Sequence, residues 1–194
     1  MPASGEQITL LLHAMDAGKE ASPERLFPLV YDELRSRARH LMGGERRDHT
    51  LQATALVHEA FLKVARPGVS FQSRLHFFNA AALAMRRILV DHAKLHTADK
   101  RGGKGWEKIS LSEVDTGGPE VDVIVLDDAL ARLADLSPRQ AQVVQLRFFA
   151  GLKDGEIAEL LECTERTVRR DWVAARLWLC GEMDVECADA PNSP

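Results

Sequence analysis

Residues 154–180 read DGEIAELLECTERTVRRDWVAARLWLC, a pattern that predicts a short helix, a tight turn and a longer helix. Thr164 stands just before the longer helix and is of a residue type that caps helix N-termini. The stretch therefore predicts a helix-turn-helix with helices at about 154–161 and 164–180. Apolar residues of the second helix recur at intervals of three or four, which places them on one face: Val168, Trp172, Ala175 and Leu179.

The opposite face of the second helix is basic near its start. At about 100° per residue, Arg166 and Arg170 lie nearly opposite the apolar stripe, and Arg169 flanks them. A helix packed by one face, with arginines near the N-terminus of the other, suits the major groove of DNA. An ordinary amphipathic helix with a solvated charged face would show the same stripe. The short helix and turn that precede it favour DNA recognition.

Outside this stretch, helical periodicity continues and no convincing alternating strand is found. Ser137-Pro138-Arg139-Gln140 predicts a helix start, with a serine cap and proline at the first helical position, and Gly151 predicts its end. Ser22-Pro23 predicts another helix start. Further helices are expected at about 54–66 and 74–97. The predicted fold class is therefore all-α.

Composition divides the chain into two helical units. Gly102-Gly103-Lys104-Gly105 and Thr116-Gly117-Gly118-Pro119 bracket a polar, acidic stretch with little periodicity, which is typical of an interdomain linker. We predict two small helical domains joined by a flexible linker. The predicted divisions are a first domain at 1–97, a linker at 98–125, a second domain at 126–182 that contains the helix-turn-helix, and a disordered tail at 183–194.

Charge is distributed unevenly between the two halves. The net charge is −4. Residues 1–104 hold 16 Lys and Arg against 11 Asp and Glu, a net +5, whereas residues 105–194 hold 9 against 18, a net −9. The placement of basic residues matters more for nucleic-acid binding than their total. No apolar run approaches the roughly 18 residues of a membrane span, and no signal peptide is evident, so a cytoplasmic protein without membrane insertion is expected.

The sequence offers little for catalysis or metal binding. Its three cysteines, Cys163, Cys180 and Cys187, form no CxxC pair, so neither a disulfide framework nor a zinc site is expected. Among seven histidines, His92 and His96 are four apart, but the sequence is not HExxH and no third ligand is evident. No phosphate loop or nucleophile elbow is present. We therefore expect no enzyme activity, no cofactor and no metal site.

Six blocks of sequence occur in a recognisable order. They are Leu26-Phe27-Pro28-Leu29-Val30-Tyr31-Asp32-Glu33-Leu34, Asp48-His49-Thr50-Leu51-Gln52, Thr54-Ala55-Leu56-Val57-His58-Glu59-Ala60, His76-Phe77-Phe78, Ala84-Met85-Arg86-Arg87-Ile88-Leu89-Val90-Asp91-His92-Ala93 and Pro138-Arg139-Gln140-Ala141. The pattern continues in the last helix with Val168, Arg170, Asp171 and Trp172. Together they closely resemble the extracytoplasmic-function sigma factors of the sigma-70 family, over about residues 6–180.

The resemblance implies a transcription initiation factor that catalyses nothing itself. Its first domain would dock on the clamp of core RNA polymerase and read the minus-ten promoter element. Its second domain would contact the polymerase flap and read the minus-thirty-five element. The linker would run through the polymerase toward its active cleft. An anti-sigma factor or another regulator stays open as an additional partner.

The resemblance also assigns residues to three surfaces. The minus-thirty-five set is Thr164, Glu165, Arg166, Thr167, Arg169 and Arg170. The minus-ten set is Phe71, Arg74, Phe77, Arg86, Arg87 and Lys94, where Phe71 is a candidate for touching single-stranded DNA. The polymerase set is Leu56, Glu59, Phe61 and Lys63. Simpler interpretations remain, since Phe61 continues an apolar stripe, Glu59 and Lys63 can pair with each other, and the basic residues can be a solubilising surface.

The chain departs from the family pattern at three places. Phe71-Gln72-Ser73 stands where the family usually has Trp-Gln-Asp. Glu162 stands where the turn of the helix-turn-helix commonly has glycine, a residue that tolerates positive φ. Lys153 replaces the usual serine cap of the first helix of the motif, and Asp154 is expected to cap instead.

Two rival functions remain open on the sequence. A stand-alone helix-turn-helix repressor or activator would bind duplex DNA tightly without polymerase, whereas a sigma factor of this type would not. A small hydrolase that uses the histidines would need a convergent acid–base pocket, and the sequence offers none.

Overall fold

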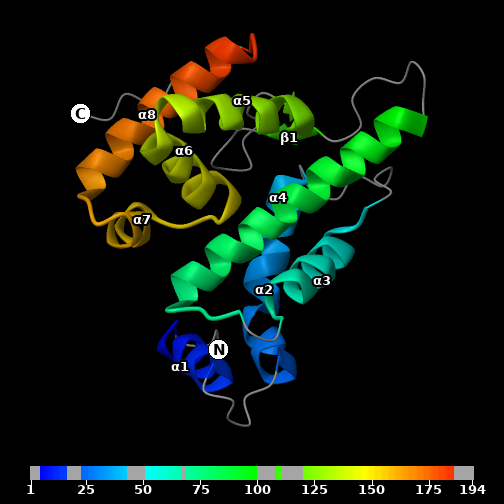
Figure 1. Cartoon of the computed structure of the whole chain (residues 1–194), viewed down its shortest axis with the longest axis vertical. Helices are drawn as coiled ribbons and strands as arrows, with labels where there is room; N and C mark the ends of the chain where they lie inside the picture. Colours follow the sequence, from blue (N-terminus) through cyan, green and yellow to red (C-terminus); the bar gives the residue numbers. More distant parts are fainter. Residues whose placement is uncertain are drawn as a thin grey trace.

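The computed structural model describes residues 5–16, 23–42, 51–66, 69–99, 108–110 and 120–185. Within these ranges the regular secondary structure is helical apart from one short β-ribbon, which confirms the all-α class (Figure 1). The elements, in chain order, are α1 (Gly5–Asp16), α2 (Pro23–Leu41), α3 (Ala53–Val64), α4 (Arg74–Asp99), β1 (Lys108–Ser110), β2 (Glu120–Asp122), α5 (Val123–Leu136), α6 (Pro138–Val144), the π-helix η1 (Gln145–Phe149), α7 (Asp154–Leu160) and α8 (Glu165–Glu182).

The helices begin where the sequence signals predict. α2 starts at Pro23 and α6 at Pro138, because proline lacks the N–H that the first turn leaves unbonded. The side chain of Ser137 makes no capping hydrogen bond, contrary to the expected serine cap. The helix that follows widens into η1, where the Ala150 N–H reaches the Gln145 carbonyl at 3.1 Å, and it ends before Gly151 at φ 71°.

The sequence showed no convincing strand, but the structure contains one pair of short strands. β1 and β2 pair antiparallel with Ile109 opposite Val121. Each strand has three residues, too few to show an alternating pattern. α4 also extends to Asp99 and α5 begins at Val123, so both ends of the expected 98–125 linker are helical. Residues 100–107, 111–119 and 186–194 lie outside the described residues, and the flexibility expected there stays a prediction.

The first helical unit, α1 to α4, is built on the long helix α4. α2 and α3 pack on one side of α4, and α1 lies near its N-terminal end (Figure 1). The backbone N–H of Arg74, the first residue of α4, donates to the Thr9 Oγ1 at 3.2 Å. The Phe77 ring contacts the rings of Phe61 and Phe78 edge-on and fills the centre of this core.

The second helical unit, α5 to α8, is an arrangement of four helices and η1. α6 packs against α5 and α8, and α7 packs against α8 (Figure 1). Cys163 in the turn before α8 is a free thiol. None of the described helices has the length and apolar character that crossing a bilayer requires.

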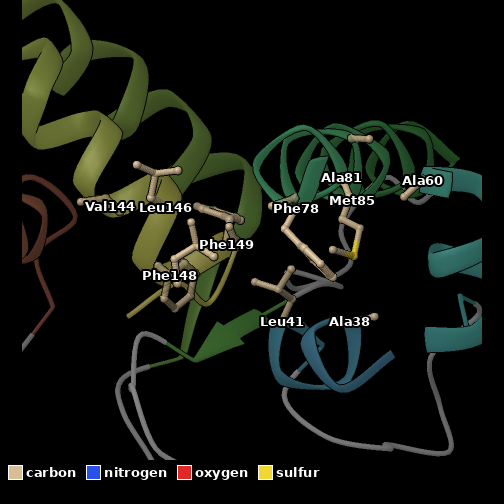
Figure 2. Close-up of a cluster of buried hydrophobic side chains, with 14 of the residues drawn as sticks. Ala38, Leu41, Ala60, Phe78, Ala81, Met85, Val144, Leu146, Phe148 and Phe149 are labelled. Atoms are coloured by element: carbon tan, nitrogen blue, oxygen red, sulfur yellow. The ribbon is translucent and has the colours of Figure 1, made fainter. Parts of the chain in front are cut away.

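The buried side chains of the two units form one continuous cluster. Phe148 and Phe149 of η1 lie beside Phe78 of α4 and Leu41 of α2, so the seam between the units is filled with apolar groups (Figure 2). In the structure, therefore, the second unit rests directly on the first. This relative placement could not be predicted from the sequence.

Candidate nucleic-acid interface

The helix-turn-helix consists of α7, a turn at residues 161–164, and α8. The carbonyl of Ala158 accepts from the Cys163 N–H at 3.0 Å, which closes the turn. The predicted apolar stripe of α8 is confirmed as its buried face, and it holds the helix against α5, α6 and α7. The buried residues of the stripe are Val168, Trp172, Ala175 and Leu179.

The two helices of the motif are capped differently. Thr164 caps α8 as predicted, because its Oγ1 accepts from the Thr167 N–H at 3.2 Å. The cap residue of α7 is Lys153, and a carboxylate oxygen of Glu156 accepts from its backbone N–H at 2.9 Å. The expectation that Asp154 caps α7 was wrong. Asp154 is the first helical residue, and its carboxylate binds Arg147 at 2.6 Å and Arg169 at 2.9 Å instead.

Glu162, in the turn, adopts the left-handed backbone conformation at φ 50°. That region is costly for a residue with a Cβ, by about 1–2 kcal/mol. Glu162→Gly should therefore raise the free energy of unfolding by about 0.5–1 kcal/mol, after the greater entropy that glycine has in the unfolded chain is subtracted. Urea denaturation followed by circular dichroism measures the change.

The neighbouring Glu159→Gly is the matched control for this prediction. Glu159 is exposed and lies inside α7, so glycine there should lower the free energy of unfolding by about 1 kcal/mol. If both variants lose stability, strain at Glu162 is not the explanation for the glycine usually found at this turn.

Arg166 and Arg169 both project from the start of α8 but differ in their partners. Arg166 is exposed and makes no hydrogen bond or ion pair to another described residue. Arg169 is bound by Asp154 at 2.9 Å and by Glu165 at 2.7 Å. Arg166 is therefore available to a ligand without breaking an internal contact, whereas Arg169 must first exchange its carboxylate partners.

Arg170 lies beside a buried carboxylate. Asp171 is only 2% exposed and accepts from the Arg139 Nε at 2.5 Å. The hydrogen bond from Arg139 to Asp171, together with the charge of Asp171, raises the pKa of Arg139. Arg170 reaches the same carboxylate at 3.4 Å, at the edge of hydrogen-bonding distance. Its guanidinium is largely exposed, so Arg170 stays open to a second ligand.

The basic residues assigned to the minus-ten surface fall into two groups. Arg87 and Lys94 are exposed on α4. Arg74 and Arg86 are partly buried and are bound by carboxylates. Burial lowers the pKa of Arg74, but hydrogen bonds and charges from Glu33 and Glu156 outweigh burial and raise it. The structure thus brings all four onto α4 but leaves only two of them free of carboxylate partners from the second unit.

The aromatic residues before and within α4 differ in exposure. Phe77 is 0% exposed and Phe78 is equally part of the core, so neither presents a surface that DNA can reach. Phe71 is half-buried in the loop before α4 and packs on Phe77 with ring centroids 5.4 Å apart. An imidazole nitrogen of His13 contacts the Gln72 carbonyl at 2.9 Å, so α1 braces this loop. No sequence signal predicted this contact between α1 and the loop.

The polymerase-binding set is divided in the same way. Leu56 and Phe61 are buried in the core, whereas Glu59 is exposed and Lys63 half-buried, and these two form an ion pair at 3.4 Å. Sequence reasoning missed an aromatic cluster beside them, in which the Phe27 ring lies 4.9 Å from the His58 ring and 5.3 Å from the Tyr31 ring. The four-residue spacing of Phe27 and Tyr31 is the sequence signal that could have indicated their shared face.

In comparisons with known proteins, the model of one protein family, described as "ECF sigma factor", matches residues 5–185 of this chain. No curated protein matches. No solved structure matches either.

Proposed function

This chain belongs to the ECF sigma factor family and so has a role in transcription initiation, and we propose that it directs core RNA polymerase to a specific set of promoters. The family is not an enzyme family, and its members have RNA polymerase and promoter DNA as partners. The observation that carries the proposal is the family match across residues 5–185. The capped helix α8, with Arg166 exposed at its start, supports it.

We assign reading of the minus-thirty-five element to the N-terminal part of α8. Residues at the start of a recognition helix reach base edges in the major groove, and Arg166 is exposed there. Arg pairs with guanine through two hydrogen bonds, whereas phosphate contacts position the helix without reading sequence. Arg166 is therefore the sequence-selective residue of this proposal, and Arg169 and Arg170 bind phosphate. Thr164, Glu165 and Thr167 complete the surface around the helix start.

We assign the minus-ten element to α4 and the loop before it. Arg87 and Lys94 supply exposed positive charge for the DNA backbone. Phe71 supplies a ring on which an unpaired base can stack. Arg74 and Arg86 join them once their carboxylate partners leave. We leave Phe77 out of the proposed contacts because it has no exposed surface.

The polymerase clamp is the partner that we propose for α3. Glu59 and Lys63 are the solvent-accessible members of the set that the family resemblance assigns there. We assign the second unit to the flap. We further propose that the protein acts in the cytoplasm, where core polymerase and the chromosome are found. An anti-sigma factor or another regulator would compete for the same surfaces.

A transcription assay with purified components tests the proposed function. The full chain is mixed with core RNA polymerase, and run-off transcripts from a genomic fragment library are sequenced. Specific start sites that appear only when the chain is present support the proposal. Failure to bind core polymerase, combined with tight binding of duplex DNA by the chain alone, would instead identify a stand-alone helix-turn-helix regulator.

Charge reversal on α3 should weaken polymerase binding. In the double variant Glu59→Lys with Lys63→Glu, the two side chains can still pair with each other, but each meets the partner with the wrong sign. We expect the dissociation constant for core polymerase, measured by fluorescence titration, to rise by about tenfold. Unchanged thermal melting of the variant shows that α3 stays intact. Unchanged affinity would remove these residues from the interface.

A further inference from the structure

We propose that a cavity between α4 and helices α5 and α6 is a binding site for a small uncharged molecule that carries an amide or lactam group on an apolar body. The inference goes beyond the proposed function and does not depend on it, because it rests only on the size and chemistry of the cavity. A molecule held there would contact both helical units of the chain at once.

The cavity lies where α4 packs against α5 and η1 (Figure 1). Its volume is about 530 Å³, within the range of roughly 300–1,000 Å³ that is typical of small-molecule sites. A single water molecule takes up only about 30 Å³, so the cavity has room for a ring compound. One wall is a single face of α4, formed by residues at intervals of three or four: His76, Asn79, Leu83 and Arg86.

Most of the opposite wall is apolar. It is formed by α5, α6, η1 and the end of α7, which contribute leucines and alanines such as Leu130, Ala134 and Leu146. Water against such a surface finds few hydrogen-bond partners, so an apolar group that displaces it gains affinity. The body of the ligand is therefore apolar.

Two polar atoms of the lining residues are unused. Gln145 is 8% exposed, and its side-chain oxygen accepts from the Arg86 Nη1 at 3.4 Å. The other end of the same amide, the Gln145 Nε2, is buried without a hydrogen-bond partner among the described residues, and so is the Asn79 Oδ1. Buried polar atoms are nearly always hydrogen-bonded. The lining therefore offers one unused donor from the second unit and one unused acceptor from the first.

The class of ligand follows from these two atoms and from the charges around them. An amide or lactam supplies a carbonyl oxygen for the Gln145 Nε2 and an N–H for the Asn79 Oδ1. A cation is disfavoured because the described lining residues include no carboxylate. An anion is disfavoured because the one charged group of the described lining, Arg86, already binds Asp127 at 2.7 Å. The site therefore favours an uncharged amide or lactam.

NMR titration of the isotope-labelled full chain with three probes of similar shape tests the proposal. Benzamide has the amide group, acetophenone keeps the carbonyl but lacks the N–H, and benzoate carries a negative charge. We expect benzamide to shift the side-chain amide signals of Asn79 and Gln145 saturably, with a dissociation constant on the order of 1 mM for so small a molecule. Acetophenone and benzoate should bind about tenfold more weakly, because both leave the Asn79 Oδ1 unpaired.

A blocking variant and a matched control locate the site. Ala131→Phe enlarges an exposed residue of the cavity wall and so fills part of the volume without replacing a core residue. Ala174→Phe makes the same change at an exposed position of α8 outside the described lining. We expect Ala131→Phe to weaken benzamide binding by about tenfold and the control to change it by less than about twofold. Thermal melting of both variants shows that the fold is intact.

A third variant, Asn79→Leu, separates ligand recognition from a structural role. It removes the unused acceptor and keeps a side chain of similar size. Because an unsatisfied buried atom is lost, the melting temperature should stay the same or rise. The preference for benzamide over acetophenone should fall from about tenfold to about twofold, since the N–H of benzamide then has no partner. A purely structural Asn79 would lower the melting temperature and leave the preference unchanged.

Three results would overturn the proposal. The first is that benzamide produces no saturable shift at Asn79 and Gln145, because water alone would then serve these atoms. The second is equal affinity of the unaltered chain for benzamide and acetophenone, because the amide group would then not be recognised. The third is undiminished benzamide binding by Ala131→Phe, which would place the binding elsewhere. None of these results bears on the proposed function, which run-off transcription with core polymerase tests separately.

Discussion

Replacing Trp172 with alanine should lower the free energy of unfolding by about 3–5 kcal/mol. Trp172 is 7% exposed and lies in the middle of the apolar stripe that holds α8 in place. The Arg147 guanidinium packs over the Trp172 ring, 5.0 Å from the ring centre. Arg147 also forms an ion pair with Asp154 at the start of α7. The substitution leaves a large cavity and removes the surface on which that ion pair rests, so both helices of the motif lose support.

Chemical denaturation followed by far-ultraviolet circular dichroism measures this loss. Val173→Ala is the control, because Val173 is the next residue of the same helix and is 45% exposed. The control should change the free energy of unfolding by about 0.5 kcal/mol or less. A loss below about 1 kcal/mol for Trp172→Ala would contradict the packing described for α8. Since whole domains are stable by about 5–15 kcal/mol, the expected loss is a large part of the total.

Arg166→Ala should weaken promoter binding by about 1–3 kcal/mol and relax the preference at one base pair of the minus-thirty-five element. Arg166 is exposed at the first turn of α8, where side chains reach base edges. Arg169→Ala and Arg170→Ala should instead weaken binding to all sequences alike and lower the salt dependence by about one unit each, as for contacts to phosphate. Arg169 should show the smaller loss, because it must first leave Asp154 and Glu165.

The measurement is polymerase-dependent binding to a library randomised at the minus-thirty-five element, at two salt concentrations, for each single variant. Arg132→Ala is the matched control, since Arg132 lies on α5, is largely exposed and pairs with Glu182 at the far end of α8. It should leave both affinity and preference unchanged. If the three arginine variants of α8 behave like this control, then α8 does not read the promoter.

Local features of the fold could be predicted from the sequence because they are determined by neighbouring residues. The starts of α2 and α6 follow from proline at the first helical position, and the cap of α8 follows from Thr164. The buried face of α8 follows from a spacing of three and four residues. The positive φ of Glu162 could be anticipated because the family pattern has glycine at that position.

The carboxylate partners of the arginines on α4 could not be predicted, because these contacts join residues that are distant in the sequence. Arg86 and Asp127 are 41 positions apart, and Arg74 and Glu156 are 82 apart. Periodicity and composition describe which face of a helix is basic, but they do not show which carboxylate lies against it. Two further features could not be predicted, since neither leaves a repeating pattern in the sequence. They are the widening of the helix into η1 and the pairing of two three-residue strands.

The connection between Asp99 and Val123 has a consequence for how the contacts between the two units respond to concentration. Because both units belong to one chain, the acidic residues stay tethered near α4 at an effective concentration on the order of millimolar. Diluting the protein does not change that value, so the contacts between the two units do not depend on the protein's concentration. Only a partner that binds the separated units more tightly than the joined ones can shift this balance.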